Sequence, residues 1–248
     1  MSDYTILERN AYTGRGMVLG VEPNGEYAIQ HYWIGGRSDL SKNRVITLDQ
    51  DTCGKPMIKT EVADPSKLEP GTDTSLIEYP AMREREGTHE HIVTNGLHTD
   101  IILNRLESGI PFRNVLIELS FEPDKPNFTP RIMGVLYQLP RGSVNVQLAL
   151  VKKAQVGTST TSREIHHFEY DAVRPGFGYC ITTYSGNGNP LPAFQGEPIL
   201  LSIDGSTFDQ LWRGLNQDTL VAMVAKRIDL KTGETKFEIR NKLTKVTA

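Results

Sequence analysis

The sequence predicts an α+β fold in which antiparallel sheets are covered by helices. About ten short runs of β-forming residues are spread along the 248-residue chain, and only three stretches show the spacing of an amphipathic helix. These helical stretches lie in mid-chain and near the end, and do not alternate with the strands. The chain contains no internal repeat and no low-complexity tract, so we expect a single domain over residues 1–248.

The N-terminal part is predicted to open with a β-hairpin. Two β-rich runs, 16–21 and 27–34, are separated by Asn24-Gly25, which is a strong signal for a hairpin turn. Residues 35–44 have no apolar period and carry three cations among turn-forming residues, which predicts a loop. After this loop we expect a short strand at 45–48, a turn at 49–56 and a surface connection at 61–74.

Three helices follow from apolar spacing. The first is expected to begin near Asp100, where Thr99 or Asp100 caps it, and to end at Gly109. The second follows Pro111, carries apolar residues at i, i+3, i+4 and i+7 from Phe112, and is stopped by Pro123. The third has Ser206 as its N-cap and repeats the same spacing from Phe208 to Leu215.

The remaining β-rich runs are assigned to strands. A strand at 75–79 is expected to end at Pro80, because proline lacks the amide proton that a sheet needs. The other strands are expected at 89–94, 131–139, 143–154, 165–173, 178–184, 199–203, 220–230 and 235–241.

Charge and composition exclude several classes of protein. The 27 Lys and Arg against 30 Asp and Glu give a net charge of −3, which excludes a strongly basic nucleic-acid binder. No run approaches the roughly 20 apolar residues of a membrane-spanning helix, and residues 1–10 are too polar for a secretory signal, so we expect a cytoplasmic protein without a membrane partner. Cys53 and Cys180 have no CxxC partner, which argues against a zinc ribbon or a disulfide framework.

The predicted loop at 35–44 is the first candidate for chemistry. Its two glycines let a ligand approach the backbone, Arg37, Lys42 and Arg44 supply positive charge, and Ser38, Ser41 and Asn43 supply neutral donors. Such a set suits a phosphate group, although a solvated polar turn has the same composition.

Other stretches leave alternatives open. His89 and His91 with His98 and Asp100 can be imagined as a metal site, yet no established zinc spacing supports it, and a turn followed by a helix cap explains the same residues. The proline-rich stretch 121–132 and the Gly/Asn-rich stretch 182–198 are either rigid parts of a site or plain connections. Removal of Met1 would leave Ser2 as an N-terminal nucleophile, a further alternative.

A set of short motifs occurs in order between residue 14 and about residue 200. They are Gly14-Arg-Gly16, Tyr32-Trp-Ile-Gly-Gly-Arg-Ser38 with Asn43-Arg44, Glu78-Tyr79-Pro80, Val93-Thr-Asn-Gly-Leu-His-Thr-Asp100, Glu122-Pro-Asp124 with Thr129-Pro-Arg-Ile132, and Thr183-Tyr-Ser-Gly186. Together these motifs resemble the archaeal-type inosine monophosphate (IMP) cyclohydrolase family, including its bacterial relatives. The resemblance implies a four-layer αββα sandwich like that of the N-terminal nucleophile hydrolases, used without an N-terminal nucleophile.

The resemblance also implies an activity. It is the closure of 5-formamidoimidazole-4-carboxamide ribonucleotide to IMP with loss of water, the last step of purine synthesis, and it requires no metal or redox cofactor. The alternatives are an amide hydrolase of the N-terminal nucleophile type and a non-catalytic purine nucleotide-binding protein. In either case the partner is a small molecule, and we expect a homo-oligomer.

By resemblance, Arg37, Tyr79 and Glu122 match the catalytic residues of the family, with Glu118 as a competitor for the acid. The substrate-binding residues are expected to be Ser38, Asn43 and Arg44 for the phosphate, with Asn95, Thr99, Asp100, Arg131 and Tyr184 around the rest of the ligand. Chemically, the arginine can stabilise charge on the formyl oxygen, and the tyrosine and the acid can move protons.

Overall fold

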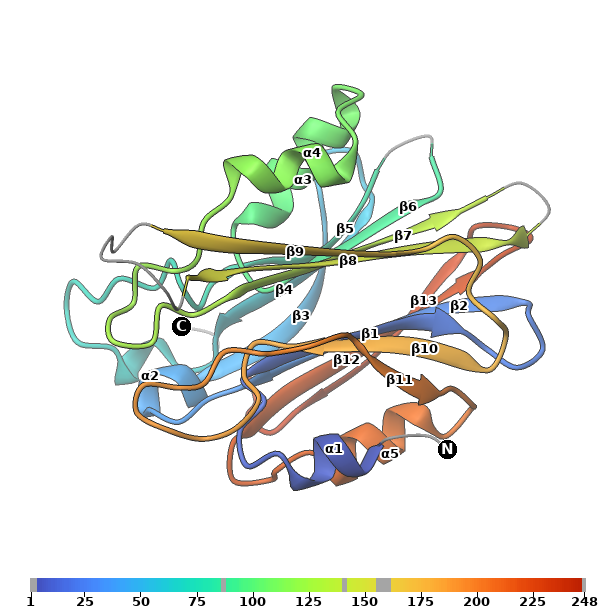
Figure 1. The fold of residues 1–248 in the computed structure, drawn as a ribbon. Helices are drawn as coiled ribbons and strands as arrows, with labels where there is room; N and C mark the ends of the chain where they lie inside the picture. The colour runs from blue at the N-terminus through green and yellow to red at the C-terminus, as the bar shows by residue number, and fades with distance from the viewer. Residues whose placement is uncertain (1–3, 86–87, 140–141, 155–161, 247–248) are drawn as a thin grey trace.

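Two antiparallel β-sheets stack face to face in the computed structural model, which describes residues 4–85, 88–139, 142–154 and 162–246 (Figure 1). Short helices cover the outer face of each sheet, so the layers follow the order helices, sheet, sheet, helices. The predicted α+β class with antiparallel sheets is therefore confirmed. The likeness to N-terminal nucleophile hydrolases remains a prediction.

Sheet A has six strands in the order β11-β10-β1-β2-β12-β13. Their bounds are β1 Arg15–Val21, β2 Tyr27–Gly35, β10 Phe177–Thr182, β11 Ile199–Ser202, β12 Leu220–Asp229 and β13 Thr235–Asn241. The hairpin of β1 and β2 confirms the predicted turn, in which Gly25 adopts a positive φ of 71° that favours glycine.

Sheet B has seven strands that follow one another in chain order, β3 to β9. Their bounds are β3 Arg44–Gln50, β4 Pro56–Val62, β5 Tyr79–Glu84, β6 Glu90–Thr94, β7 Arg131–Gln138, β8 Val144–Lys153 and β9 Arg163–Tyr170. Each strand pairs with the next in antiparallel orientation. The connection from β6 to β7 is long and contains α3, α4 and η2.

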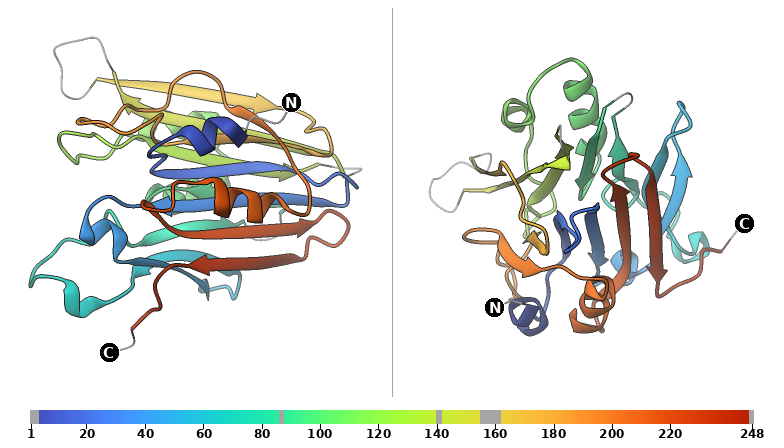
Figure 2. Two further views of the ribbon diagram at one scale, coloured as in Figure 1. Left: turned by 90° about the horizontal axis from the view of Figure 1, so that it is seen from below. Right: turned by 90° about the vertical axis from the view of Figure 1, so that its right-hand side faces the viewer.

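The strands are apolar on both faces because each sheet packs against a sheet on one side and helices on the other. In β1 all seven residues are buried; Met17 and Leu19 face sheet B, whereas Val18 faces the helices α1 (Tyr4–Arg9) and α5 (Thr207–Gly214). Figure 2 shows α1 and α5 side by side on the outer face of sheet A. The outer face of sheet B packs in the same way against α3 (His98–Glu107) and α4 (Phe112–Val115).

The three predicted helices exist, with different ends. The first, α3, begins at His98 with Leu97 as N-cap, so the expectation that Thr99 or Asp100 caps it is wrong. The second is α4 followed by the 3-10 turn η2 (Leu116–Glu118), which ends before the predicted stop at Pro123. In α5 Ser206 occupies the N-cap position, but its side chain makes no capping hydrogen bond.

Several elements differ from the sequence prediction. The predicted loop 35–44 contains a one-turn helix, α2 (Asp39–Lys42), and the helix α1 and the strand β4 were not predicted. Residues 75–77 form a turn and not a strand. The strand β5 begins later, at Tyr79, and accommodates Pro80 beside an irregularity in its pairing with β4, where Ile58 pairs with Met82 and Lys59 with Pro80, so that Ala81 of β5 is the extra residue.

One end of the sandwich collects the polar motifs of the sequence. The strands β1, β3, β5 and β7 begin at this end, and β2, β6 and β10 finish at it, which is the left end in Figure 1. Motifs that are up to about 170 residues apart in sequence therefore meet there, as the hydrogen bond from Thr183 Oγ1 to Thr13 O illustrates. Within the described residues, no helix is long and apolar enough to cross a membrane.

Candidate active site

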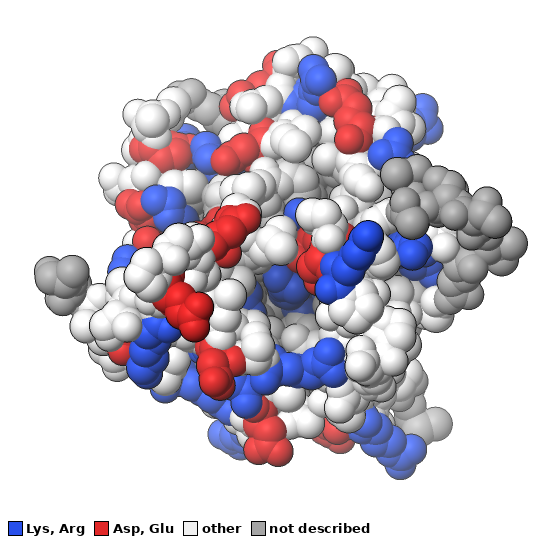
Figure 3. Space-filling view, turned by 90° about the vertical axis from the view of Figure 1, so that its left-hand side faces the viewer, with Lys and Arg blue, Asp and Glu red and all other residues white. Residues whose placement is uncertain are grey.

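A cavity of about 330 Å³ opens between the two sheets at this end. It is lined by the start of β1, by α2, by the turn before β5, by the 121–130 connection and by the loop after β10. Figure 3 shows this end of the molecule, where Lys and Arg side chains lie in a recess with acidic side chains around it. A chain that is slightly acidic overall thus presents local positive charge here.

Arg15 enters the cavity from the first residue of β1, and two glycines fix its backbone. Gly14 has a positive φ of 67°, and a Cβ on it would lie 2.2 Å from Thr183 Oγ1. A Cβ on Gly16 would lie 2.0 Å from the ring of Trp33. The amide of Arg15 donates to Thr183 Oγ1 at 3.1 Å, which ties β1 to the end of β10. Only glycine fits on either side of this arginine.

Glu122 is the buried acid of the cavity, with 1% of its surface exposed. Its Oε1 accepts a hydrogen bond from Arg131 Nη1 at 2.7 Å and lies 3.8 Å from Arg15 Nη2. Burial raises the pKa of Glu122, and the charges of Arg15 and Arg131 oppose that effect without cancelling it. A carboxyl in this environment is suited to both accepting and returning a proton.

Three predicted substrate-binding residues, Asn95, Thr99 and Arg131, do not line the cavity. The side chain of Asn95 donates to Pro130 O and accepts from the amide of Ile132, both at 2.9 Å, which fixes the start of β7. Thr99 Oγ1 donates to the carbonyl of Gly96 at 2.9 Å. A Cβ on Gly96 would lie 2.0 Å from Arg131 Nη1, so this turn holds the arginine closely.

Tyr79 meets a second tyrosine that the sequence did not indicate. Its hydroxyl lies 2.8 Å from that of Tyr32, and the pair joins sheet B to sheet A next to the cavity. Burial raises the pKa of Tyr32, and the hydrogen-bonded partner Tyr79 raises it further. Neither tyrosine is among the residues that line the cavity directly, and Tyr79 is 3% exposed.

Arg44 is buried behind α2 and does not line the cavity. Its Nε donates to Ser41 O at 2.7 Å and its Nη2 donates to Gly35 O at 2.8 Å, while Nη1 is buried without a partner among the described residues. Asn43 likewise exchanges two hydrogen bonds with the backbone of Asp64. Both residues therefore shape the loop that was expected to hold a phosphate.

Arg37 and Ser38 lie at the mouth of the cavity. Arg37 is exposed; its Nη1 donates to Asn187 Oδ1 at 2.7 Å and to Gly188 O at 2.9 Å, so it joins α2 to the loop after β10. Ser38 caps α2 by accepting from the amide of Ser41, and the hydroxyl of Ser41 donates to the carbonyl of Ser38. Ser38 is exposed and Ser41 is half-buried.

Tyr184 forms a side wall of the cavity. Its ring stacks on that of Tyr12 with centroids 5.6 Å apart, and its hydroxyl lies 2.6 Å from Thr129 Oγ1. Thr129 in turn donates to Asp124, and both residues line the cavity. Burial raises the pKa of Tyr184, so the phenol stays protonated.

Two further residues considered in the sequence analysis, Asp100 and Glu118, also do not line the cavity. Asp100 lies in the first turn of α3, where it forms an ion pair with Arg83 at 2.7 Å. Glu118, the competitor for the acid, is exposed and pairs with Arg105, whereas Glu122 lies in the cavity.

The imagined metal site does not form among the described residues, which contain no group of three or more His, Cys, Asp or Glu side chains able to hold an ion. His91 Nδ1 lies 2.9 Å from Lys226 Nζ, whereas His98 Nε2 faces Ile132 O at 3.4 Å. Burial lowers the pKa of both histidines. Ser2, the residue of the N-terminal nucleophile alternative, lies outside the described residues.

Sequence reasoning gave no role to four residues of this region: Arg15, Tyr32, Asp124 and Thr129. A signal existed for Arg15, because an arginine between two glycines occurs at the start of a predicted strand. The other three belong to motifs that carry the family resemblance, which assigned them no role.

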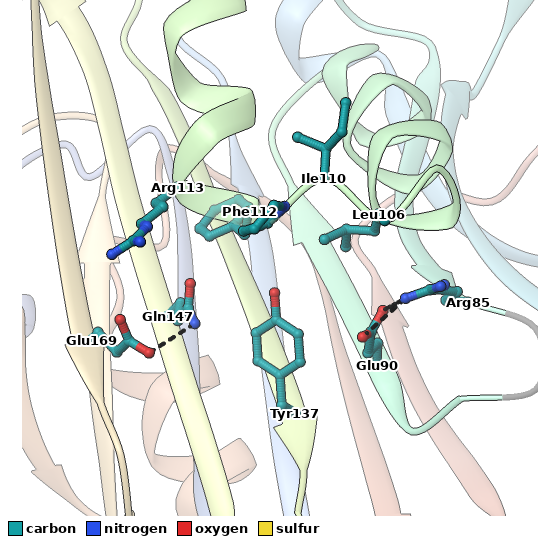
Figure 4. A pocket seen from close by; sticks show the side chains of 11 residues that line it. Arg85, Glu90, Leu106, Ile110, Phe112, Arg113, Tyr137, Gln147 and Glu169 are labelled. Carbon is teal, nitrogen blue, oxygen red and sulfur yellow. Dashed lines mark hydrogen bonds and ion pairs between the residues drawn. The ribbon is translucent and has the colours of Figure 1, made fainter.

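A second cavity, of about 380 Å³, lies between the outer face of sheet B and the helices α3 and α4 (Figure 4). Its acidic side chains are engaged: Glu90 pairs with Arg85, and Glu169 accepts from Gln147. Tyr137 points up between them toward Phe112. None of the predicted site residues lines this second cavity, so the cavity beside Arg15 and Glu122 is the candidate active site.

Comparison with known proteins agrees with the sequence motifs. The model of a family described as IMP cyclohydrolase-like protein matches residues 12–232. An IMP cyclohydrolase of Methanococcus maripaludis strain C6 is 33% identical over 129 residues, which is 50% of this chain and 58% of that protein. An IMP cyclohydrolase of Haloarcula marismortui is 28% identical over 128 residues, which is 50% of this chain and 54% of that protein. The chain thus spans somewhat more than half the length of these curated relatives, and no solved structure matches it.

Proposed function

We propose, from the premise that the chain belongs to the IMP cyclohydrolase-like protein family, that it closes 5-formamidoimidazole-4-carboxamide ribonucleotide to IMP and water. The observation that carries the proposal is Glu122, a buried carboxyl that lines a cavity beside the guanidinium groups of Arg15 and Arg131. Ring closure needs a group that takes a proton from a poorly acidic amide and later returns one to a leaving hydroxyl. A carboxyl whose pKa is raised by burial suits both tasks.

The reaction has two chemical stages. The carboxamide nitrogen attacks the formyl carbon, the C=O electron pair moves to oxygen, and Glu122 takes a proton from the attacking nitrogen. The oxygen is then protonated and leaves as water, while the former formamide nitrogen loses its proton and forms the new C=N bond. The protein contributes by holding the two arms together and by stabilising the charge on the oxygen.

The phosphate is assigned to the mouth of the cavity. Arg37 supplies a guanidinium there, and Ser38 and Ser41 supply hydroxyl donors. Arg44 and Asn43 act through the loop, because the side chain of Arg44 binds the loop's own backbone and that of Asn43 ties the loop to the backbone of Asp64. This division leaves the deep part of the cavity, at Arg15 and Glu122, for the imidazole with its two reacting arms.

Two further residues complete the proposed site. Tyr79, hydrogen bonded to Tyr32, delivers a proton toward the reacting oxygen from behind Arg15. Tyr184, fixed by its contact with Thr129, forms the wall beside the ribose and the base. Asp100 receives no role in binding, because it is paired with Arg83. The proposed reaction involves a small-molecule substrate and no other partner. The homo-oligomer and the cytoplasmic location stay predictions from the sequence.

Ultraviolet absorbance tests the proposal, because closure of the purine ring changes the spectrum of the formylated ribonucleotide. The wild type is expected to accelerate closure, and Glu122→Gln is expected to lower kcat by about 10²–10⁴-fold through loss of the proton carrier. Tyr79→Phe should lower kcat in the same direction. Glu118→Gln is the matched control, since Glu118 is an exposed acid four residues away, and it should leave the rate unchanged.

The outcome separates the alternatives. A wild-type protein that binds IMP but gives no acceleration would be a non-catalytic nucleotide-binding protein. Equal rates for the wild type and the Glu122→Gln and Tyr79→Phe variants would contradict the mechanism. Mass spectrometry of the mature protein addresses the amide hydrolase, which would require a chain that begins at a nucleophilic residue.

A further inference from the structure

Four arginines surround the site, and they differ in how far their donors are already used. Arg37 is exposed and bound to Asn187 and Gly188. Arg44 is buried and holds two backbone carbonyls. Arg131 donates to Glu122 at 2.7 Å, and its Nη1 also approaches Asn95 O at 3.4 Å. Each of these three is committed to the protein or lies outside the buried part of the cavity.

Arg15 is different, because its guanidinium lines the cavity and is largely uncommitted. Within the part of the chain that the structure describes, it makes one side-chain hydrogen bond, from Nη2 to Leu76 O at 3.2 Å. Its Nε is buried without a partner. Its Nη2 lies 3.8 Å from Glu122 Oε1, which is close enough for an ion pair but too long for a hydrogen bond. Nε of Arg15 is enclosed by protein, as Nη1 of Arg44 is, and neither atom is open to a ligand. Nη1 of Arg15 is not enclosed in this way and has no hydrogen-bond partner among the described residues, so a ligand atom in the cavity can accept from it.

The surroundings also hold Arg15 ready for a ligand. Its side chain is 10% exposed, Gly14 and Gly16 fix its backbone, and Thr183 binds its amide. The charge of Glu122 raises the pKa of Arg15 against the effect of burial, so the guanidinium stays charged. Preorganised positive charge in a site with little water stabilises a developing oxyanion strongly.

We propose that Arg15, and not Arg37, is the catalytic arginine that binds the formyl oxygen as the tetrahedral intermediate forms. This inference rests on the proposed ring closure. The formyl C=O pair moves to the oxygen when the carboxamide nitrogen attacks, and the guanidinium of Arg15 donates to that oxygen. The contact ends when the oxygen leaves as water. Arg37 then serves the phosphate at the mouth, which divides the two arginines between catalysis and binding.

The test compares Arg15→Met with Arg37→Met in the absorbance assay and in calorimetric binding of IMP. IMP lacks the formyl oxygen, so Arg15→Met should bind IMP with a Kd within about threefold of the wild type while its kcat falls by about 10²–10³-fold. Arg37→Met should show the opposite pattern, with raised KM, weakened IMP binding and a kcat close to that of the wild type. Arg15→Lys should recover little of kcat, because an ammonium lacks the planar fork of the guanidinium.

Two outcomes for Arg15→Met would contradict the proposed role of Arg15. A kcat of Arg15→Met within about threefold of the wild type would overturn the inference while leaving the ring closure intact. Parallel losses of kcat/KM and IMP affinity in Arg15→Met would make Arg15 a ground-state binding residue and would also overturn it. If Arg15→Met does not fold, as judged by circular dichroism, Arg15→Lys decides the matter with the same two measurements. A wild type without ring closure would refute the proposed function itself.

Discussion

Two buried clusters of charge lie between the same two sheets, one at the cavity and one further along the sandwich. At the cavity, Glu122 faces Arg15 and Arg131. In the other cluster, Lys226 Nζ of sheet A lies 2.7 Å from Glu84 Oε1 of sheet B and 2.9 Å from His91 Nδ1. Both clusters place charged side chains at 1–12% exposure or close to it, so burial alone does not distinguish them.

The difference lies in charge balance and in contact with a cavity. The second cluster matches one ammonium with one carboxylate, and burial lowers the pKa of Lys226 to about 8. In the cavity cluster the guanidinium groups of Arg15 and Arg131 face the one carboxyl of Glu122, and Arg15 and Glu122 line the cavity. The comparison teaches that a matched buried pair joins the two sheets, whereas an unmatched cluster beside a cavity is prepared for a ligand.

The largest expected effect on stability comes from breaking the matched pair. Glu84→Gln leaves the buried ammonium of Lys226 without its counter-charge, so we expect the free energy of unfolding to fall by about 3 kcal/mol. Denaturant unfolding of the variant and the wild type measures this. Replacing both residues, by Glu84→Leu with Lys226→Met, should recover most of the loss. A double variant as unstable as the single one would show that the pair does more than balance charge.

A pH effect of similar size is expected outside both clusters, at His31. Burial lowers the pKa of His31 to about 4, and its ring stacks on Phe208 beneath sheet A. The unfolded chain binds this proton near pH 6.5, so stability should fall as pH drops from 6.5 to 4, by at most about 3 kcal/mol. His31→Phe keeps the stacking and removes the titration. Its unfolding free energy should therefore vary less over this pH range than that of the wild type.

A smaller effect is expected at the mouth of the cavity. Ser38→Ala removes the capping hydrogen bond of α2, which should lower the free energy of unfolding by about 1 kcal/mol. The same change removes a proposed phosphate donor, so KM should rise while kcat changes little. Ser66→Ala is the matched control, because Ser66 is an exposed serine in a neighbouring turn that does not line the cavity. An unchanged KM in Ser38→Ala would remove Ser38 from the phosphate site.

The smallest effect on stability is expected for Glu122→Gln. Burial raises the pKa of Glu122 and so disfavours its anion, which makes loss of this negative charge in Glu122→Gln less costly to the fold than loss of the Glu84 charge. We therefore expect the free energy of unfolding at pH 7 to change by less than about 1 kcal/mol. Chemical unfolding of Glu122→Gln beside Glu84→Gln measures the contrast between the two clusters. Equal losses of unfolding free energy in both variants would show that the two clusters do not differ in their contribution to stability.

Much of the fold was predictable because it follows from local patterns. The turn at Asn24-Gly25 and the apolar spacing of α3, α4 and α5 each correspond to an observed element. The strand β5 was misplaced because Pro80 ends a strand in most contexts, whereas here it lies next to an extra residue in the pairing of β5 with β4. That irregularity depends on strand pairing, which sequence spacing does not encode.

The candidate site was predictable to a lesser degree. The resemblance placed Glu122, Arg37 and Ser38 at one cavity, as the structure does. It did not distinguish side chains that face the cavity from those that hold the backbone, such as Arg44 and Asn95, because both kinds are polar and lie in the same motifs. Arg15 received no role, although it stands in the motif Gly14-Arg-Gly16, because the position of its guanidinium beside Glu122 depends on packing that sequence spacing does not encode.

The most direct test of the central claim is the rate of ring closure in the two variants that remove one acid from each cluster. Glu84→Gln should retain a kcat within about threefold of the wild type at a temperature where it is folded. Glu122→Gln should lose about 10²–10⁴-fold. Equal kcat values for the two variants, with IMP binding intact in both, would contradict the assignment of catalysis to the cavity at the end of the sandwich.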